Sequence, residues 1–224
     1  MSQPKQAIRR ILIVDDHAVV RRGLALMIGM EPDLEVAAEA CSLEDAVGLL
    51  KSVSLDLALV DLSLQGPSGL DLIRHISAQH PSVRMVALSM YDESIWLDRV
   101  LRAGGHGFVS KDASIEVLMS AVRKVLAGGV YISDQAQARL FENLKAANAS
   151  AETLLLPRLS NRELEVLTLM AQGLGTAEIA SLLSRSVKTV ESHKENLKQK
   201  LGLKTGIALM RYAVEHSLNP SGRS

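Results

Sequence analysis

The chain has 224 residues, 47% of them hydrophobic, and its 25 lysine and arginine residues balance 25 aspartate and glutamate residues. This balance excludes a uniformly basic protein that coats nucleic acid, but it does not exclude a local basic face. The single cysteine, Cys41, excludes an intramolecular disulfide, and no run of about 18 apolar residues indicates a membrane span. Because the N-terminal segment is polar and unlike a signal peptide, we expect a cytoplasmic protein of one or two domains with no membrane contact.

Short apolar runs alternate with helical patterns in the first part of the chain. We predict strands over 11–14, 35–40, 57–60, 85–88 and 107–109, and helices over 18–30, 43–53, 69–79, 94–103 and 114–126. Three of the strands are continuously apolar, which is typical of parallel strands that are covered on both faces. The five strand–helix units predict an α/β fold with a five-stranded, doubly wound parallel sheet.

Polar residues follow four of these strands. Asp15 and Asp16 follow the first, Asp61 the third and Ser89 the fourth, and Lys111 lies just past the fifth. The carboxyl ends of parallel strands form the ligand-binding edge of such a sheet, so we expect these side chains at one edge. Adjacent carboxylates repel each other unless a cation offsets them, and Mg²⁺ takes one or two carboxylates together with water and phosphate oxygens.

The residue types at this edge fit phosphoryl transfer. Asp61 stands alone at its strand end and is the better candidate for the nucleophile, whereas the Asp15–Asp16 pair is the better metal seat. The Lys111 ammonium group would offset charge on the transferred group, and the Ser89 hydroxyl would donate a hydrogen bond to one phosphoryl oxygen.

These residues also have structural interpretations. The Asp15–Asp16 pair could be a solvated turn, and Ser89 could be a simple cap at a strand end. His17 follows the aspartate pair, but we interpret it as a helix-start residue because the inferred metal is hard and the other ligands are carboxylates.

A pair of glycines at 128–129 interrupts the alternating pattern. We interpret residues 128–154 as a linker that holds one helix, predicted over 135–149. The apolar stripe of this helix could pack on either domain or on a second copy of the chain.

Closely spaced helices follow the linker. Ser160 and Glu163 form a capping box at the start of the first helix, and Thr176 is the expected N-cap of the second. A short turn, SRSV, leads to the helix in KTVESHKENLKQKLGL, and a last helix is predicted over 205–216. A helix, a tight turn and a second helix predict an all-α helix-turn-helix domain over 155–219. The helix that starts at Thr176 is expected to bury Ile179, Ala180, Leu182 and Leu183.

The helix-turn-helix segment carries a local positive charge. Residues 182–204 contain six lysine and arginine residues and two glutamates, a difference of +4 in a chain whose net charge is zero. A basic helix face is often merely solvated, but its place after a tight turn favours DNA binding.

The first domain resembles the receiver domain of bacterial two-component response regulators. The resemblance covers residues 10–127 and rests on VDDH, LVDLSL, ALS and GFVSK, in this order. It implies a flavodoxin-like fold and phosphoryl transfer from a sensor histidine kinase to Asp61. It also implies Mg²⁺ bound by the side chains of Asp16 and Asp61 and the carbonyl of Ser63, with Asp15 acting through water.

The same resemblance implies roles for three further residues. Ser89 and Phe108 would be a coupled switch pair, and Lys111 would be the cation that binds the phosphoryl group. We expect phosphorylation to draw in Ser89 and Lys111, to repack Phe108 inward and to change the face between residues 94 and 111.

The second domain resembles the LuxR-type DNA-binding domain, so that the whole chain is similar to NarL/FixJ-type response regulators. The matching text is LSNRELEVL, AQGLGTAEIASLL and SVKTVESHKENLKQKLGL. The resemblance places the second helix of the motif in the major groove. The candidates for phosphate contact are Lys188, Thr189, His193 and Lys194, with Lys198 also on the DNA-binding side, and the candidates for base edges are Glu191, Ser192 and Glu195.

We therefore expect a phosphorylation-switched transcription factor. Its expected partners are a sensor histidine kinase, double-stranded promoter DNA, a second copy of the chain after phosphorylation, and RNA polymerase. No enzyme activity is expected beyond self-phosphorylation and self-dephosphorylation at Asp61.

Two alternatives belong to other classes of protein. A Mg²⁺-dependent phosphatase of the haloacid dehalogenase type would use an Asp nucleophile, but such enzymes carry an Asp-x-Asp pair on one strand. A DNA-binding protein whose receiver is never phosphorylated would keep its regulation after Asp61→Asn.

Overall fold

The structure, a computed structural model, describes residues 7–64, 68–91, 93–138 and 159–216. The chain divides into two compact units, Met1–Asp134 and Gln135–Ser224. Residues 128–134, which were predicted to start the linker, group with the first unit. Residues 134–138 are helical, but most of the helix predicted over 135–149 lies outside the described residues.

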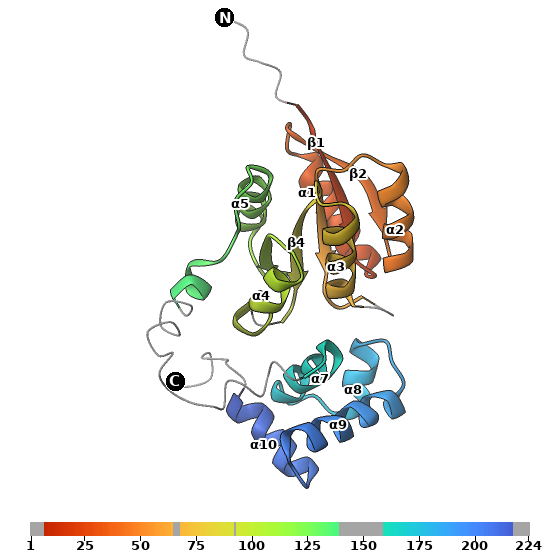
Figure 1. Cartoon of the computed structure of the whole chain (residues 1–224), viewed down its shortest axis with the longest axis vertical. Coiled ribbons are helices and arrows are strands. Elements are labelled where there is room, and N and C mark those ends of the chain that lie inside the picture. Colours follow the sequence, from red (N-terminus) through yellow and green to blue (C-terminus); the bar gives the residue numbers. More distant parts are fainter. Residues whose placement is uncertain (1–6, 65–67, 92, 139–158, 217–224) are drawn as a thin grey trace, which may run out of the picture. The chain divides into compact units, whose positions relative to one another are not determined.

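The first unit contains a parallel sheet with the strand order β2-β1-β3-β4-β5. This order confirms the predicted five-stranded, doubly wound sheet (Figure 1). The strands are β1 (Arg9–Val14), β2 (Leu34–Ala40), β3 (Leu57–Asp61), β4 (Arg84–Ser89) and β5 (Gly107–Ser110). Each strand is slightly longer than predicted, and Asp61 and Ser89 are the last residues of β3 and β4 rather than the residues after them.

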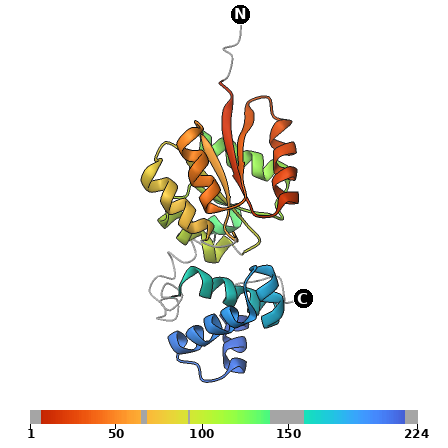
Figure 2. The same ribbon diagram turned by 90° about the vertical axis from the view of Figure 1, so that its right-hand side faces the viewer.

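Helices cover both faces of this sheet (Figures 1 and 2). They are α1 (Ala18–Gly29), α2 (Leu43–Ser52), α3 (Gly69–Gln79), α4 (Glu93–Arg102) and α5 (Ile115–Leu126). One core cluster joins α1 and α5 to buried residues of all five strands. It includes Leu24 of α1, Leu59 of β3 and Leu118 of α5. Since helices pack on both sides, every side chain of β3 is buried, which explains its continuously apolar sequence before Asp61.

Local sequence signals start several of these helices. The hydroxyl groups of Ser42, Ser68 and Ser114 accept hydrogen bonds from backbone N–H groups in the first turns of α2, α3 and α5. These contacts satisfy donors that have no partner within the helix. A serine N-cap therefore marks the start of each of these three helices in the sequence.

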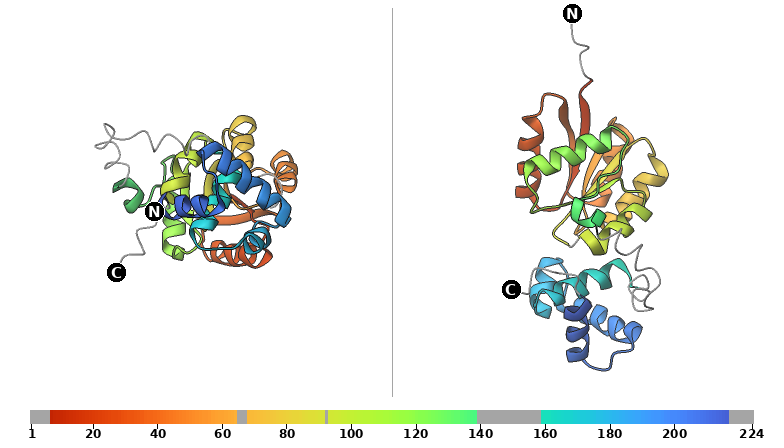
Figure 3. Two further views of the ribbon diagram at one scale, coloured as in Figure 1. Left: turned by 90° about the horizontal axis from the view of Figure 1, so that it is seen from below. Right: turned by 90° about the vertical axis from the view of Figure 1, so that its left-hand side faces the viewer.

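Residues 159–216 of the second unit form α7 (Asn161–Ala171), α8 (Thr176–Leu182), α9 (Val187–Leu201) and α10 (Gly206–His216), drawn from teal to blue in Figure 3. The predicted capping box at Ser160 and Glu163 is confirmed. Both α7 and α8 pack against α9, and α10 packs against α7. Lys200 of α9 donates to Oε2 of Glu163 at 2.7 Å, which ties the end of α9 to the start of α7.

Two details predicted for α8 are wrong. Gly175 is the N-cap, because Glu178 accepts a hydrogen bond from its N–H at 2.7 Å, so Thr176 is already helical. Leu182 is 56% exposed, whereas Ile179, Ala180 and Leu183 are buried. The buried three form a stripe along one side of the short helix, and Leu182 lies beside that stripe.

Candidate functional site

The acidic site lies at the carboxyl edge of the sheet. Val14 pairs with Val60 in the parallel register of β1 and β3, which brings Asp15 and Asp61 next to each other. Both carboxylates are fully buried, and the side chain of Asp16 is 8% exposed. The sheet register therefore assembles the three predicted carboxylates at one place.

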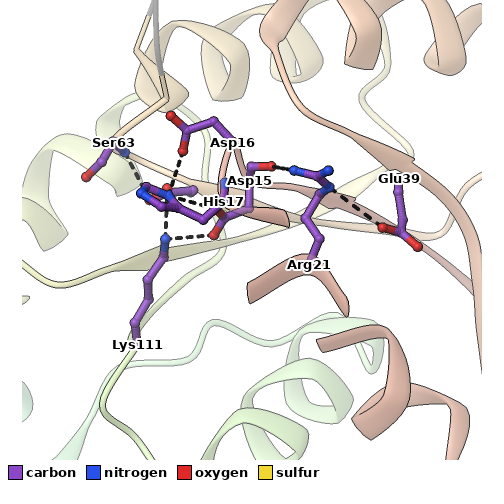
Figure 4. A network of polar contacts seen from close by, with 8 residues as sticks. Asp15, Asp16, His17, Arg21, Glu39, Ser63 and Lys111 are labelled. Carbon is purple, nitrogen blue, oxygen red and sulfur yellow. Dashed lines mark hydrogen bonds and ion pairs between the residues drawn. The ribbon is translucent and has the colours of Figure 1, made fainter. Parts of the chain in front are cut away.

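Lys111 connects two of these carboxylates. Its Nζ lies 2.7 Å from Oδ2 of Asp15 (Figure 4) and 2.8 Å from Oδ2 of Asp61. Its backbone N–H donates to the carbonyl of Ser89 at 2.9 Å, which aligns the residue after β5 with the end of β4. A single ammonium group thus faces two buried carboxylates, so this lysine offsets only part of their charge.

Burial and neighbouring charges shift the pKa values of this pair. Burial raises the pKa of Asp61, Lys111 opposes that shift and Asp15 adds to it, so that the pKa lies above its ordinary value. Burial acts to lower the pKa of Lys111, but the carboxylates of Asp61 and Asp15 outweigh it and raise the pKa. Lys111 is therefore a cation at neutral pH, and a further positive charge here would favour ionised Asp61.

Four side chains of this edge offer ligand atoms for a cation. One atom each from Asp15, Asp16, His17 and Asp61 lies within 4.8 Å of the others. Oδ1 of Asp16 and Oδ2 of Asp61 are buried, and beyond their ion-pair contacts with His17 and Lys111 they accept no hydrogen bond from the described residues. Buried carboxylate oxygens with so few donors are the hard ligands that suit Mg²⁺, so the residues present fit that ion.

His17 has the structural role that was predicted for it. It is the N-cap of α1, and its backbone N–H donates to Oδ1 of Asp15 at 2.7 Å. Its Nδ1 lies 2.8 Å from Oδ1 of Asp16 and 3.3 Å from Oδ1 of Asp15. The exposed imidazole thus also contacts the aspartate pair, a contact that the sequence interpretation left out.

The remaining predicted residues are Ser63, just after β3, Ser89, the last residue of β4, and Phe108 in β5. The backbone N–H of Ser63 donates to Oδ1 of Asp61 at 3.0 Å. Ser89 is fully buried, and its hydroxyl accepts a hydrogen bond from the N–H of Tyr91 at 3.0 Å. Phe108 is already fully buried, and Lys111 already contacts Asp61. The movement of these side chains on phosphorylation stays a prediction.

Gly69 contributes to the site in a way that sequence reasoning missed. A Cβ atom on Gly69 would lie 1.9 Å from the carbonyl oxygen of Asp61 and 2.8 Å from Cα of Leu62. Only glycine therefore lets α3 start directly against the backbone of Asp61. The available signal was a glycine at the first position of a helix, where other residues have better helix propensity.

The helix-turn-helix unit presents one polar face of α9. Lys188, Glu191, Ser192 and Glu195 are exposed, whereas Val190 and Leu197 are buried on the opposite side. This separation confirms the predicted orientation of α9, apart from Leu201, which is only partly buried.

Several candidate DNA-binding residues already make contacts within this unit. Lys194 donates to the Thr176 hydroxyl at 2.9 Å, and Lys198 forms an ion pair with Glu195 at 2.6 Å. His193 is partly buried, and burial lowers its pKa. Thr189 is partly buried near the N-cap, Ser186, whose hydroxyl accepts from its N–H. Lys188 differs from Lys194 and Lys198, because its exposed side chain forms neither a hydrogen bond nor an ion pair with the residues that the structure describes.

A receiver-type α/β unit that precedes a helix-turn-helix unit defines a response regulator that binds DNA. Residues 11–123 match the family model of the response regulator receiver domain, and residues 157–213 match that of the bacterial regulatory proteins of the luxR family. The chain therefore belongs to the two-component response regulators with a LuxR-type DNA-binding domain, and it regulates transcription by binding DNA.

Curated relatives and solved structures of this family align with nearly the whole chain. The oxygen regulatory protein NreC of Staphylococcus carnosus is 39% identical over 213 residues, which cover 93% of this chain and 98% of NreC. The Salmonella typhimurium RcsB response regulator superposes with a TM-score of 0.64 at 29% identity, over 93% of this chain and 98% of RcsB. RcsB bound to promoter rprA in the presence of the phosphomimetic BeF3⁻ gives a TM-score of 0.60 at 29% identity, over 92% and 98%.

None of the helices in the described part of the chain is both long and apolar enough to cross a bilayer.

Proposed function

We propose that a sensor histidine kinase phosphorylates Asp61 and that this modification controls DNA binding by the LuxR-type domain. The observation that carries the proposal is the contact of Lys111 with Asp15 and Asp61, beside buried carboxylate oxygens that have few donors. A site with partly compensated carboxylates and a fixed cation suits a transient, highly charged group.

The phosphoryl group passes from a histidine nitrogen of the kinase to a carboxylate oxygen of Asp61. The P–N bond breaks, a P–O bond forms, and the histidine nitrogen keeps the electron pair of the broken bond. The Lys111 ammonium group, 2.8 Å from the Asp61 carboxylate, attracts the phosphoryl oxygens, and the Ser89 hydroxyl donates to one of them. The same site later loses the group by hydrolysis, so its chemistry is confined to self-phosphorylation and self-dephosphorylation.

The proposed cofactor is Mg²⁺. The side chains of Asp16 and Asp61 and the carbonyl of Ser63 would hold it, with Asp15 acting through water, as in the receiver resemblance. When bound, the ion supplies positive charge that offsets the phosphoryl oxygens. Two buried oxygens, Oδ1 of Asp16 and Oδ2 of Asp61, support this assignment, because they accept no hydrogen bond from the described residues beyond their ion-pair contacts.

Phosphorylation then shifts a conformational equilibrium of the chain. The product state forms a homodimer that reads two half-sites of promoter DNA about one helical turn apart, or a multiple of that. One RcsB structure contains two RcsB dimers bound to two parallel DNAs, and this dimeric mode of a relative supports the proposal. We also propose that the DNA-bound protein contacts RNA polymerase at the promoter. The protein would act in the cytoplasm, together with the DNA.

In this proposal α9 enters the major groove. Lys188, at the exposed first turn, contacts phosphate together with Thr189, His193, Lys194 and Lys198. Glu191, Ser192 and Glu195 face the base edges, where a glutamate accepts from the amino group of cytosine.

The test of the proposal is the site of modification. Wild type and Asp61→Asn are incubated with a small phosphodonor and Mg²⁺, and phosphate incorporation is located by mass spectrometry of peptides. We expect incorporation on the peptide that contains Asp61 in wild type and none in the variant. Equal incorporation in both proteins would show that Asp61 is not the acceptor.

A further inference from the structure

The glycine turn after α5 leads the chain back to the edge of the sheet. Gly128, with φ +89°, and Gly129 donate to carbonyl groups of the last turn of α5. Tyr131 then forms a parallel bridge with Gly107 of β5, and its N–H donates to the carbonyl of His106 at 2.9 Å. The residues that begin the predicted linker are thus bound to the strand that carries Phe108.

Two residues later the chain contacts α4. The hydroxyl of Ser133 donates to Oε2 of Glu93 at 2.5 Å, and its backbone N–H donates to Oε1 at 3.1 Å. Both hydrogen bonds have a charged acceptor, which makes them stronger than bonds between neutral groups. Glu93 is the first residue of α4, so this contact joins the linker to the start of that helix.

Tyr131 packs closely at this place. Its side chain contacts the core cluster of the first unit, and Nζ of Lys124 in α5 lies 5.8 Å from the centre of its ring. A Cβ atom on Gly107 would lie 3.1 Å from Cβ of Tyr131, so this glycine leaves the room that the bridge needs. The first unit therefore holds residues 131–133 by backbone, side-chain and charged contacts at once.

A short path leads from the acceptor site to Glu93. The Ser89 hydroxyl accepts from the N–H of Tyr91, two residues before Glu93, and the ring of Tyr91 stacks on Trp96 of α4 with 5.0 Å between the ring centres. If Ser89 turns to a phosphoryl group on Asp61, as proposed above, the hydrogen bond to Tyr91 changes. The start of α4 is then free to shift relative to Ser133.

We propose that residues 131–133 form a latch, in which Ser133 on Glu93 and Tyr131 on Gly107 hold the start of the interdomain linker, and that phosphorylation of Asp61 opens it. This inference rests on the proposed acceptor role of Asp61 and names the element that carries the signal onward. An open latch lengthens the tether before α7 and gives the DNA-binding domain more freedom to pair with a second copy. Ser133 and Glu93 are positioning residues, since neither touches the acceptor.

The test uses the full-length chain and two variants, Ser133→Ala and Glu93→Gln. Ser120→Ala, an exposed serine on α5, is the matched control. For each protein, promoter-DNA affinity is measured with and without acetyl phosphate and Mg²⁺, and phosphate incorporation at Asp61 is measured separately.

We expect both latch variants to be phosphorylated at the rate of wild type and to bind DNA more tightly without the donor. The ratio of affinities with and without donor should fall at least about threefold, within the range by which residues between two sites change coupling. The double variant should behave like the stronger single variant, since both substitutions remove the same contact between Ser133 and Glu93. The Ser120→Ala control should keep the wild-type ratio.

Hydrogen exchange gives a readout that does not depend on DNA. The N–H groups of Tyr131 and Ser133 should exchange faster after phosphorylation of wild type and should not respond in Asp61→Asn. A wild-type ratio in both latch variants, or unchanged exchange at 131–133 in phosphorylated wild type, would overturn the latch. A failure of the proposed function looks different, because wild type itself would then show no donor response.

Discussion

At the scale of single residues, the position of Asp61 depends on a close backbone contact with Gly69 as well as on the charges around its carboxylate. Lys111 faces Asp15 and Asp61, and their positions are set by the strands that carry them. The carbonyl of Asp61 also lies directly against Gly69. An enlarged residue 69 would therefore displace Asp61, the proposed acceptor, without touching any charged group.

Gly69→Ala tests this contact. The new methyl group would overlap the Asp61 carbonyl, so we expect a loss of about 1–3 kcal/mol in the free energy of unfolding and slower phosphorylation of Asp61. Denaturant titration and phosphate incorporation measure the two effects. Gly48→Ala is the matched control, because a Cβ at Gly48 in α2 meets nothing within 4 Å, and it should be neutral or stabilising. If both variants behave alike, the contact at Gly69 does not position Asp61.

At the scale of elements, His106, the residue just before β5, forms hydrogen bonds with β4. The Nδ1 atom of His106 accepts from the N–H of Met85 at 3.2 Å, and the backbone N–H of His106 donates to the Met85 carbonyl at 2.8 Å. Burial, with a smaller effect from Arg84, lowers the pKa of His106 below its ordinary 6.5. The folded unit thus favours the neutral ring that can accept this hydrogen bond.

The shift at His106 predicts a pH dependence of stability. Below the unfolded pKa of 6.5 the unfolded chain binds the proton more readily than the folded chain, so the contribution is present above that pH and is lost as pH falls. His106→Asn supplies an acceptor that does not titrate, and it should reduce the fall in melting temperature between pH 7 and pH 5. Thermal unfolding at both pH values measures this effect, and an equal fall in variant and wild type would contradict it.

Two residues on the exposed face of α9 should affect DNA binding in different ways. Lys188→Ala should weaken binding to all sequences alike and lower the slope of log affinity against log salt by about 1, since it removes a phosphate contact. Glu191→Gln should change the preferred base at one position from cytosine towards adenine, an effect of about 1–3 kcal/mol. Selection from a randomised half-site together with a salt titration separates the two. An unchanged base preference in Glu191→Gln would remove Glu191 from the base edges.

The elements differ in how far the sequence predicts them. The buried strands have continuously apolar sequences that end at polar residues, so these strands and the polar edge could be predicted from that pattern, whereas β2 is partly exposed and does not follow it. The ends of the strands were predicted less accurately, because pairing with a neighbouring strand sets them. The first strand begins at Arg9, two residues before its predicted start, because Arg9 pairs with Leu34 of β2. Thr176 was misplaced because a glycine bound by Glu178 is the N-cap of the short α8, and Leu182 was misplaced because the buried stripe of that helix passes beside it.

Contacts between distant residues explain what the sequence could not predict in the site. The ion pair of Lys111 and Asp15 joins residues 96 positions apart, and only the strand register brings them together. The same holds for Glu93 and Ser133, which are 40 positions apart. The residue types at the site were predictable, whereas the close approach of Gly69 and the contact of His17 with two carboxylates required the fold.

At the scale of the whole molecule, control requires that a change at Asp61 alters the DNA affinity of a separate unit. Such a coupling is a free energy shared by the two sites, typically about 1–3 kcal/mol. It acts in both directions, so promoter DNA should also favour the phosphorylated form. The receiver and the LuxR-type domain are separate compact units, and residues 131–133 are the first part of the connection between them.

The most direct measurement is the promoter-DNA affinity and the mass in solution of wild type and Asp61→Asn, each with and without a phosphodonor plus Mg²⁺. We predict that the donor makes wild type dimeric and raises its DNA affinity about 5- to 150-fold, the range of a typical allosteric coupling, while Asp61→Asn does not respond. Equal DNA affinity and equal mass in both proteins under all conditions would contradict this prediction, because the acidic site would then not control DNA binding.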